Sequence, residues 1–265
     1  FAKVPYGTWI IREIESPKGF VLSEEEITVT IGAVDEVVEI ELVNYFIKGN
    51  IELNKVDKDY PDNKLTGAEF EVYTDTNGDG KLDNGDKLLG TMTELDGGVY
   101  QMKELRYGKY LVREKTAPTG FVLDENVYSV SIEENGKTYI VENEAGVGFV
   151  NAAQKGSLKI VKTSSDGKIE GFSFRVTGAN GYDQTFKTDK NGEIFIEGLR
   201  IGEYTVSEVN DSVSAGYILP ADKQATVKVG ATTIVEMHNE LRDTPKTGDD
   251  FNLALWVSLA AASVI

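Results

Sequence analysis

The sequence contains no cysteine and a single histidine, His238. Disulfide bonds and thiolate metal sites are therefore excluded, and most hydrolase templates fail because a Ser-His-Asp triad or a histidine-rich metal site needs more partners. His238 alternates with Val235, Met237 and Asn239, which places it on the outer face of a predicted strand. We therefore interpret His238 as a surface residue.

Positive charge is also scarce, since 27 Lys and Arg residues stand against 44 Asp and Glu residues and give a net charge of −17. A chain of this charge is not expected to bind nucleic acid or anionic lipid as a whole. Sustained helical periodicity is missing, whereas 27 glycines and many Val, Ile, Thr and Tyr residues favour strands and turns. With 265 residues, 40% of them hydrophobic, the chain is predicted to be all-β, with several small sandwich domains.

A strand pattern of the form Gly-x-aromatic-x-aliphatic-x-Glu occurs three times. It reads GTWIIRE, GKYLVRE and GEYTVSE, and it ends at Glu13, Glu114 and Glu208. Because side chains alternate between the two faces of a strand, each carboxylate shares the apolar face with an aromatic and an aliphatic residue. The glutamates are 101 and 94 residues apart, so the pattern indicates an array of domains rather than a short-period solenoid.

Two other polar residue types recur at the end of an apolar strand face. Asparagine ends the patterns EIELVN, GVGFVN and IVEMHN, as Asn44, Asn151 and Asn239. Lysine ends the patterns GNIELNK and GSLKIVK, as Lys55 and Lys162, each 11 residues after an asparagine. A complete module thus opens with a lysine strand, has a glutamate strand in its middle and closes with an asparagine strand. We expect the lysine of the first module to lie upstream of Phe1, and both ends of the chain to be cut.

These three residue types can react with one another if they are buried together. Burial favours a neutral lysine amine and a protonated glutamate, because an unpaired buried charge costs several kcal/mol. The neutral amine is a nucleophile, and the protonated glutamate can polarise an asparagine carboxamide and relay protons as general acid and base. Attack would release ammonia and form an isopeptide bond, Lys55 to Asn151 and Lys162 to Asn239. The plain alternative is that these polar residues are strand ends in solvent.

The motifs YLVREKTAPTGF, IELNK, LKIVK, FVN and MHN resemble the Cna B-type (SpaA-type, prealbumin-like) domains of Gram-positive surface proteins and pilins. The resemblance covers nearly all of residues 1–242. It implies tandem Ig-like β-sandwiches of about seven strands, Lys–Asn bonds with a catalytic glutamate, and an extracellular stalk or pilus role. The third module departs from the pattern, because EVNDSVSAGY lacks the proline of ESPKGF and KTAPTGF and carries two extra residues. This departure concerns its local turn more than its triad.

The predicted divisions are residues 1–47, the C-terminal half of a first module; 48–153 and 154–242, two complete modules; and 243–265.

The last segment contains Thr244-Pro245-Lys246-Thr247-Gly248 before the apolar stretch FNLALWVSLAAASVI. It resembles a sortase sorting signal, usually Leu-Pro-x-Thr-Gly, with Thr244 in place of leucine. The resemblance implies cleavage between Thr247 and Gly248 and transfer of Thr247 to an amine of peptidoglycan or of a pilin. A Pro/Gly linker before an apolar tail is the alternative, and the apolar stretch of 15 residues is shorter than the ~20 of a spanning helix.

Residues 75–86, DTNGDGKLDNGD, match much of the pattern of an EF-hand calcium loop. Glycine stands at position 6, as Gly80, and the oxygen ligands at positions 1, 3, 5, 7, 9 and 12 would be Asp75, Asn77, Asp79, the Lys81 carbonyl, Asp83 and Asp86. Asp86 replaces the usual glutamate, and strand-like segments rather than helices flank the loop. The sequence predicts a Ca²⁺ cofactor here, with a polar hairpin turn as the alternative.

Taken together, these features predict the extracellular stalk of a Gram-positive cell-wall-anchored surface protein, which is not a turnover enzyme. One alternative is a sortase-polymerised pilin, which would need a donor lysine in a motif such as Tyr-Pro-Lys; the nearest match, Tyr60-Pro61-Asp62, lacks it. A second is the repeat region of an adhesin that binds a host extracellular-matrix ligand. A third is the spacer of an extracellular enzyme, for which no catalytic site is visible.

Overall fold

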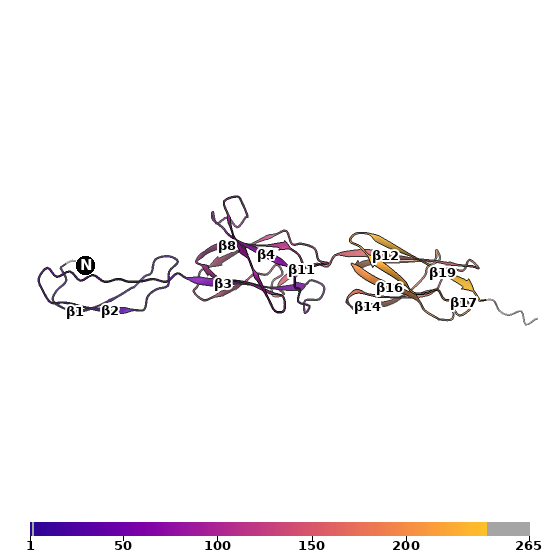
Figure 1. The fold of residues 1–265 in the computed structure, drawn as a ribbon, viewed down its shortest axis with the longest axis horizontal. Coiled ribbons are helices and arrows are strands. Elements are labelled where there is room, and N and C mark those ends of the chain that lie inside the picture. Colours follow the sequence, from indigo (N-terminus) through magenta and orange to yellow (C-terminus); the bar gives the residue numbers. More distant parts are fainter. Residues whose placement is uncertain (2, 243–265) are drawn as a thin grey trace, which may run out of the picture. The chain divides into compact units, whose positions relative to one another are not determined.

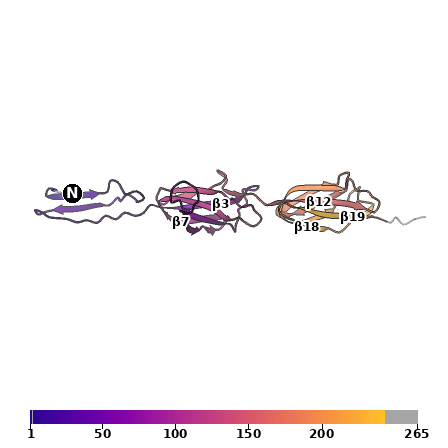
Figure 2. The ribbon, with the colours of Figure 1, turned by 90° about the horizontal axis from the view of Figure 1, so that it is seen from above.

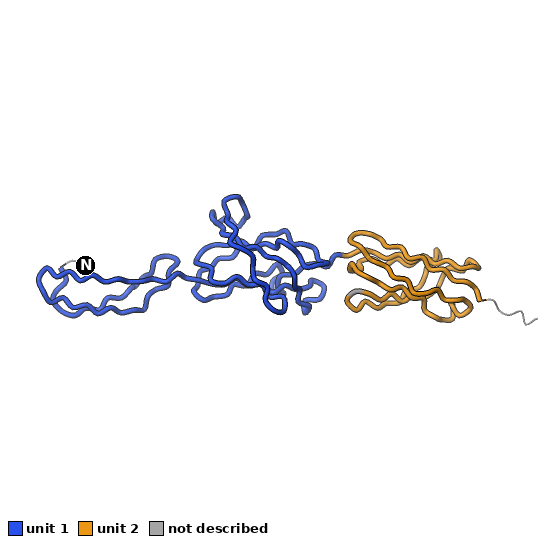
Figure 3. Tube along the Cα trace, viewed as in Figure 1, with its two compact units in different colours: residues 1–154 blue, residues 155–265 orange. Residues whose placement is uncertain are grey.

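The computed structural model describes residue 1 and residues 3–242, and the predicted sorting signal, residues 244–248, lies outside the described residues. The described chain consists of strands and turns with one short 3₁₀ helix, η1 (Ala179–Gly181), which confirms the all-β prediction (Figure 1). It divides into two compact units, Phe1–Gln154 and one that begins at Lys155 (Figure 3). Within residues 3–242, no helix is long and apolar enough to cross a membrane.

The first unit holds the strands of the predicted first and second modules. They are β1 (Gly7–Arg12), β2 (Glu26–Ile31), β3 (Lys48–Asp57), β4 (Glu69–Thr74), β5 (Lys87–Thr91), β6 (Thr93–Leu95), β7 (Val99–Arg106), β8 (Gly108–Thr116), β9 (Val127–Ile132), β10 (Thr138–Ile140) and β11 (Phe149–Asn151). The second unit holds the strands of the third module. They are β12 (Lys155–Ser164), β13 (Ser173–Gly178), β14 (Tyr182–Lys187), β15 (Glu193–Arg200), β16 (Gly202–Glu208), β17 (Tyr217–Ile218), β18 (Lys223–Val227) and β19 (Thr232–Leu241).

Each complete module contains two sheets whose inner faces form one core, with five and four strands in the second module and four strands each in the third. In the second module the sheets have the orders β10-β3-β7-β6 and β5-β4-β8-β9, and β11 also pairs with β3. In the third module the orders are β15-β12-β19-β17 and β14-β13-β16-β18. Figure 2 labels β12, β18 and β19 of this module. The strand with the lysine and the strand with the glutamate therefore belong to different sheets, so the two side chains approach each other only across the core.

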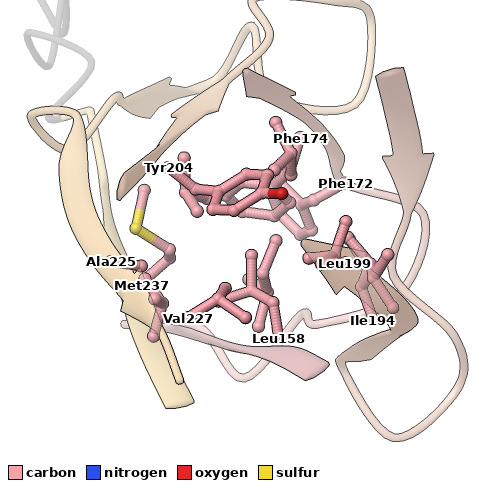
Figure 4. Packing of buried hydrophobic residues seen from close by; sticks show 14 of the residues in the cluster. Leu158, Phe172, Phe174, Ile194, Leu199, Tyr204, Ala225, Val227 and Met237 are labelled. Atoms are coloured by element: carbon pink, nitrogen blue, oxygen red, sulfur yellow. The ribbon is translucent and has the colours of Figure 1, made fainter. Parts of the chain in front are cut away.

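Alternating apolar residues explain why the two sheets pack together. On β12, Leu158 and Ile160 are fully buried and join Phe172, Phe174 and other apolar residues in a continuous cluster, shown in Figure 4. On β3, Ile51 and Leu53 are likewise fully buried. The next residue of the same parity on each strand is the lysine of the predicted triad, so the strand pattern itself directs the lysine into the core.

The first and last strands of each complete module pair in parallel, which is the main contact that closes the module. Lys162 lies opposite Met237 in the β12–β19 register, and Lys55 lies opposite Phe149 in the β3–β11 register. Asn239 and Asn151 each follow two residues later. Because side chains two residues apart share a face, the asparagine of each module is a diagonal neighbour of the lysine on the core side of the sheet.

The predicted asparagine strands are shorter than expected in two of the three modules. In the second module, β10 and β11 both pair with β3, but residues 141–148 leave the sheet between them, so the predicted strand 146–151 begins only at Phe149. In the first module, residues 39–44 form no strand. The partner of an asparagine strand in the other modules is a lysine strand, and the described residues of the first module contain none.

The aromatic residue of the repeated Gly-x-aromatic pattern fixes the turn before it. Its polar hydrogen donates to the carbonyl oxygen four residues earlier: Trp9 to Pro5 at 3.1 Å, Tyr110 to Arg106 at 2.6 Å and Tyr204 to Arg200 at 2.9 Å. The glycine in between has a positive φ, 155° at Gly108 and 142° at Gly202, which a residue with a Cβ rarely adopts. These bonds position the start of each glutamate strand.

The turn after the glutamate strand of the third module uses side chains where the other modules have proline. The Ser214 hydroxyl is fully buried, donates to the Val209 carbonyl and accepts from the Asp211 N–H. The Asp211 carboxylate accepts from the Ser173 hydroxyl at 2.7 Å and from the N–H groups of the turn. The two extra residues of this module are thus accommodated by a hydrogen-bonded turn.

After this turn, an aromatic residue pairs with the chain just beyond the asparagine in all three modules. The pairs are Phe20 with Phe46, Phe121 with Ala153, and Tyr217 with Leu241. The second residue of each pair stands two positions after Asn44, Asn151 or Asn239. This shared pairing gives a structural alignment of the three modules that does not depend on the length of the turn.

Candidate functional site

In the second module the three predicted residues meet in the core. Lys55 is fully buried, and Glu114 and Asn151 are 3% and 2% exposed. The Lys55 Nζ atom lies 3.5 Å from one carboxylate oxygen of Glu114, and the Asn151 amide donates to the other at 2.8 Å. The carboxylate of Glu114 therefore connects an amine and a carboxamide that belong to the first and last strands of the module.

The surroundings of Lys55 favour its neutral form. Burial lowers the pKa of Lys55 from 10.5 to about 8, although the charges of Glu114 and Asp124 oppose this change. Its Nζ atom also donates to the Phe149 carbonyl at 3.1 Å and lies 4.9 Å from the centre of the Phe149 ring. An amine with this pKa is deprotonated far more often near neutral pH than an exposed lysine, and the neutral form is the nucleophile.

The third module brings the same residue types into its core, but its lysine has a different hydrogen-bond partner. Lys162 and Asn239 are almost completely buried and Glu208 is 9% exposed. The Asn239 amide donates to Glu208 at 2.6 Å, as in the second module, whereas the Lys162 amine donates to the Thr163 carbonyl. Burial lowers the pKa of Lys162 and raises the pKa of Glu208, so both side chains are shifted towards neutrality.

The first module contains the glutamate–asparagine half of this arrangement. The Asn44 amide donates to both carboxylate oxygens of Glu13, at 2.9 and 2.7 Å, and to the Val21 carbonyl at 3.2 Å. In the second module the Asn151 amide likewise donates to the carbonyl of Val122, which stands at the matching position. The pair is therefore arranged as in a complete module although no lysine of the described residues joins it.

The carbonyl oxygen of the asparagine is unpaired in both complete modules. In the part of the chain that the structure describes, Asn151 Oδ1 and Asn239 Oδ1 are buried without a hydrogen-bond partner, as are Glu114 Oε1 and Glu208 Oε2. Leaving a buried acceptor unpaired costs about 1–3 kcal/mol. A proton on the glutamate could be donated to the asparagine oxygen, which would satisfy both atoms and draw electron density away from the carboxamide carbon. The arrangement is thus suited to polarising this carbon beside a buried amine.

The residues that hold the glutamate were not predicted from the sequence. The backbone N–H of Ser23 donates to Glu13, and that of Asp124 donates to Glu114, both at 2.8 Å. Backbone donors carry no side-chain signature, so residue-type reasoning does not detect them. The signal that could have identified them is positional, because the repeated segments GFVLS and GFVLD place Ser23 and Asp124 ten residues after their glutamates.

The predicted calcium loop forms a hairpin between β4 and β5 in which side-chain oxygens accept loop hydrogens. Asp75 is largely buried and accepts from the N–H groups of Gly78 and Gly80 at 2.7 and 3.1 Å. The remaining predicted side-chain ligands also accept hydrogens within the loop: Asn77, Asp79, Asp83 and Asp86. Among the described residues, no group of three or more His, Cys, Asp or Glu side chains converges to hold a metal ion. Calcium binding therefore stays a prediction.

The lone histidine has no catalytic surroundings. His238 is exposed, and its ring nitrogens contact the Thr163 hydroxyl at 2.8 Å and the Glu240 carboxylate at 3.1 Å. Thr163 and Glu240 are themselves exposed. This placement agrees with the interpretation of His238 as a surface residue.

Comparison with known proteins identifies the kind of module. The family of SpaA prealbumin-like fold domains matches residues 1–45, 49–145 and 156–241, which is most of the chain. No curated protein matches the chain. A solved structure described as the Bacillus anthracis TIE protein is 26% identical, with a TM-score of 0.70 over 89% of this chain and 42% of its own. The chain thus spans less than half of that structure.

Two further solved structures have lower TM-scores. GBS52, described as the minor pilin of Streptococcus agalactiae, is 18% identical, with a TM-score of 0.34 over 76% of this chain and 98% of its own. A C-terminal fragment of the pilus adhesin SpaC from Lactobacillus rhamnosus GG is 14% identical, with a TM-score of 0.45 over 75% of this chain and 98% of its own.

Proposed function

Because the chain belongs to the family of SpaA prealbumin-like fold domains, we propose that it is a structural part of a bacterial surface protein whose modules are closed by Lys–Asn isopeptide bonds. The carrying observation is the buried contact of Glu114 with both the Lys55 amine and the Asn151 amide. The proposed location is the outside of a Gram-positive cell, attached to the wall.

The proposed reaction joins an amine to a carboxamide and needs no further reactant. The neutral Nζ atom of Lys55 attacks the carboxamide carbon of Asn151 while protonated Glu114 donates to the carbonyl oxygen. In the resulting intermediate, Glu114 accepts a proton from the attacking nitrogen and passes it to Nδ2. The C–Nδ2 bond breaks while the proton on the oxygen returns to Glu114 and the C=O bond re-forms, so ammonia leaves and the new amide keeps one hydrogen on Nζ. Lys162, Glu208 and Asn239 have the same roles in the third module.

The strand pairing supplies the proximity that this slow reaction requires. An amine and an unactivated amide react very poorly in water, and fixed neighbours gain a large effective concentration. Each bond forms once and is not regenerated, so the chain acts on itself and is not a turnover enzyme. Asn151 follows Lys55 by 96 residues, and closing a loop of that length would stabilise the module by about 4–5 kcal/mol if it behaves like a disulfide.

Intact mass spectrometry tests the proposal. The chain is expected to weigh less than its calculated mass by two molecules of ammonia, one for each complete module. Glu114→Gln keeps the side-chain shape but removes the acid, so it is expected to abolish one deficit, and Glu208→Gln the other. Glu71→Gln is the matched control, because Glu71 is another largely buried carboxylate, on β4, that is paired with Arg113 and lies outside the triads. A wild-type chain of full calculated mass would refute the cross-links.

The anchoring role rests on the sequence of residues 244–248 and is proposed separately. A sortase would cleave between Thr247 and Gly248 and transfer Thr247 to an amine of peptidoglycan or of a pilin. Incubation with purified sortases and a glycine-based or lysine-based amine is expected to give a product that ends at Thr247, and Thr247→Ala to give none. Uptake of a lysine-bearing pilin in place of a wall peptide would favour the pilin alternative. Lack of cleavage by every sortase class would contradict anchoring by this signal.

A further inference from the structure

The glutamate of the third module lacks a hydrogen bond that the other two modules have. The paired aromatic residues Phe20, Phe121 and Tyr217 align the modules, and the residues three positions after them are Ser23, Asp124 and Pro220. The N–H groups of Ser23 and Asp124 donate to their glutamates at 2.8 Å. Pro220 has no N–H group, so it cannot make this bond.

Glu208 therefore has one hydrogen-bond donor fewer than Glu114, although each of the two glutamates has one buried oxygen without a hydrogen bond. The Oε1 atom of Glu208 accepts from the Asn239 amide at 2.6 Å, and its Oε2 atom is buried without a hydrogen-bond partner in the described structure. Glu114 has the N–H of Asp124, the Asn151 amide and the Lys55 amine around its two oxygens. A buried carboxylate with fewer donors is less stable as an anion and more stable when it is protonated.

We propose that this position sets the protonation state of the glutamate before the bond forms. The N–H of Asp124 holds Glu114 as a carboxylate paired with Lys55, whereas Pro220 leaves Glu208 neutral at rest. Asp124 in the second module and Pro220 in the third are thus positioning residues for the proposed cross-linking reaction. This inference rests on the proposed function.

The charged groups around both glutamates agree with this difference. Glu208 faces Lys162 on β12 and Asp211 in the following turn. Burial is the largest cause that raises the pKa of Glu208, and the charge of Asp211 raises it further. The hydrogen bond from Asn239 and the charge of Lys162 lower the pKa. Lys162 also faces Asp166. Glu114 faces Lys55 on β3 and Tyr100 on β7, and Asp124 lies near Lys55. The second module therefore has a Lys55–Glu114 contact with a backbone donor beside it, and the third has Glu208 without that donor.

The protonation state changes how the reaction depends on pH. Attack requires a neutral amine and a protonated glutamate, a state with one proton shared by the pair. At low pH the pair gains a second proton and the amine is blocked, which gives the acid limb of the rate profile. An N–H donor stabilises the carboxylate and moves this limb to lower pH. The acid limb of the third module is therefore expected at higher pH than that of the second.

The experiment follows bond formation in each module separately. Unreacted chain, isolated unfolded in urea and verified by its full mass, is refolded across pH 4 to 9, and ammonia loss is followed with time on peptides from each module. Pro220→Ala restores an N–H and is expected to lower the acid limb of the third module by about one pH unit, typical of one hydrogen bond to a charged group. Asp124→Pro is expected to raise that of the second module by a similar amount.

Asp124→Asn separates the N–H from the charge of the side chain. It keeps the N–H and removes a negative charge, so its acid limb moves to lower pH or stays, the opposite of the shift expected for Asp124→Pro. If Asp124→Pro does not fold, the shift of the acid limb in Pro220→Ala still tests the inference. Coincident limbs in both modules that do not respond to Pro220→Ala would overturn this inference while the cross-links stand. No ammonia loss in either module would overturn the proposed function itself.

Discussion

At the scale of the residue, the unusual feature is a lysine that occupies an apolar strand position. Lys55 and Lys162 follow two fully buried aliphatic residues of the same parity on β3 and β12. A buried ammonium is costly, so folding shifts these amines towards their neutral form before any reaction takes place. In the proposed reaction the nucleophile is thus generated by burial, and no separate base is needed to deprotonate it.

The buried amine has a measurable effect on stability when the bond is blocked. In Asn151→Ala the Lys55 amine stays free, with a pKa of about 8 in the folded state and 10.5 as the ordinary value. Between these values the unfolded state binds more protons, so the free energy of unfolding of the first unit is expected to rise as the pH increases from about 8 to 10.5. Below pH 8 the full cost of burying the amine applies.

Urea unfolding at several pH values measures this rise. The control is Lys55→Met in the Asn151→Ala background, which removes the titrating amine and leaves all other groups in place. The rise is the difference between the two variants, so titration of other lysines and tyrosines cancels. Equal slopes in both variants would show that Lys55 titrates normally in the folded state.

At the scale of the element, the sequence predicted the strands that carry the glutamate and the lysine, because these have strict alternation between glycines. The sequence-based prediction was wrong for two segments whose strand formation depends on a neighbouring strand. Residues 39–44 have the alternating pattern but no partner strand, and residues 146–148 leave the sheet before β11 begins. Alternation indicates a strand only when a neighbour is present to accept its hydrogen bonds.

Part of the candidate site was likewise predicted from the sequence and part was not. Glu114, Lys55 and Asn151 were predicted because three polar residue types recurred at the ends of apolar faces, and the structure brings them together. The backbone donors of Ser23 and Asp124 were not predicted, because any residue except proline can supply them. The proposed difference in glutamate protonation between the second and third modules therefore depends on one backbone N–H group, which becomes visible only when the paired aromatic residues align the modules.

The hairpin of residues 75–86 is the element whose function can be tested most directly. Calcium is expected to bind it and to stabilise the first unit by mass action, because the ion would bind only the folded loop. Asp79→Asn keeps the oxygen that accepts the Lys81 N–H and removes one charge, so it is expected to weaken binding without unfolding the turn.

Titration calorimetry and thermal unfolding with and without calcium provide the measurement. Asp62→Asn, which removes an exposed carboxylate outside the loop, is the control and is expected to leave both unchanged. The absence of both heat and a thermal shift in the wild-type chain would leave the loop as an ordinary polar hairpin.

At the scale of the whole molecule, the proposed bonds decide which part of each module carries a pull on the chain. In the third module the bond would join Lys162 and Asn239, which lie near the same end of the parallel strands β12 and β19. A pull would pass along β12, cross the bond and leave through the end of β19. Residues 163–238 would then carry none of the load.

Single-molecule stretching tests this load path. Wild-type modules are expected to show no unfolding extension between the bonded residues. Glu208→Gln should add an event of about 250 Å, the extended length of the freed segment at ~3.4 Å per residue. The second module of the same molecule stays closed and serves as the internal control. An event of this length in the wild-type chain would contradict a bond in the third module.

The interruption between β10 and β11 has a consequence for how the second module tolerates change. Both flanking strands are held in register by β3, so residues 141–148 start and end at fixed points of the sheet. Insertions at the exposed residues 144–146, which spare buried Val141 and the Asn143 side chain bonded to Val150, would therefore leave Asn151 in place, whereas a single-residue insertion within the uninterrupted β19 would rotate Asn239 out of the core. Foreign peptides for display on the module should accordingly be grafted at residues 144–146.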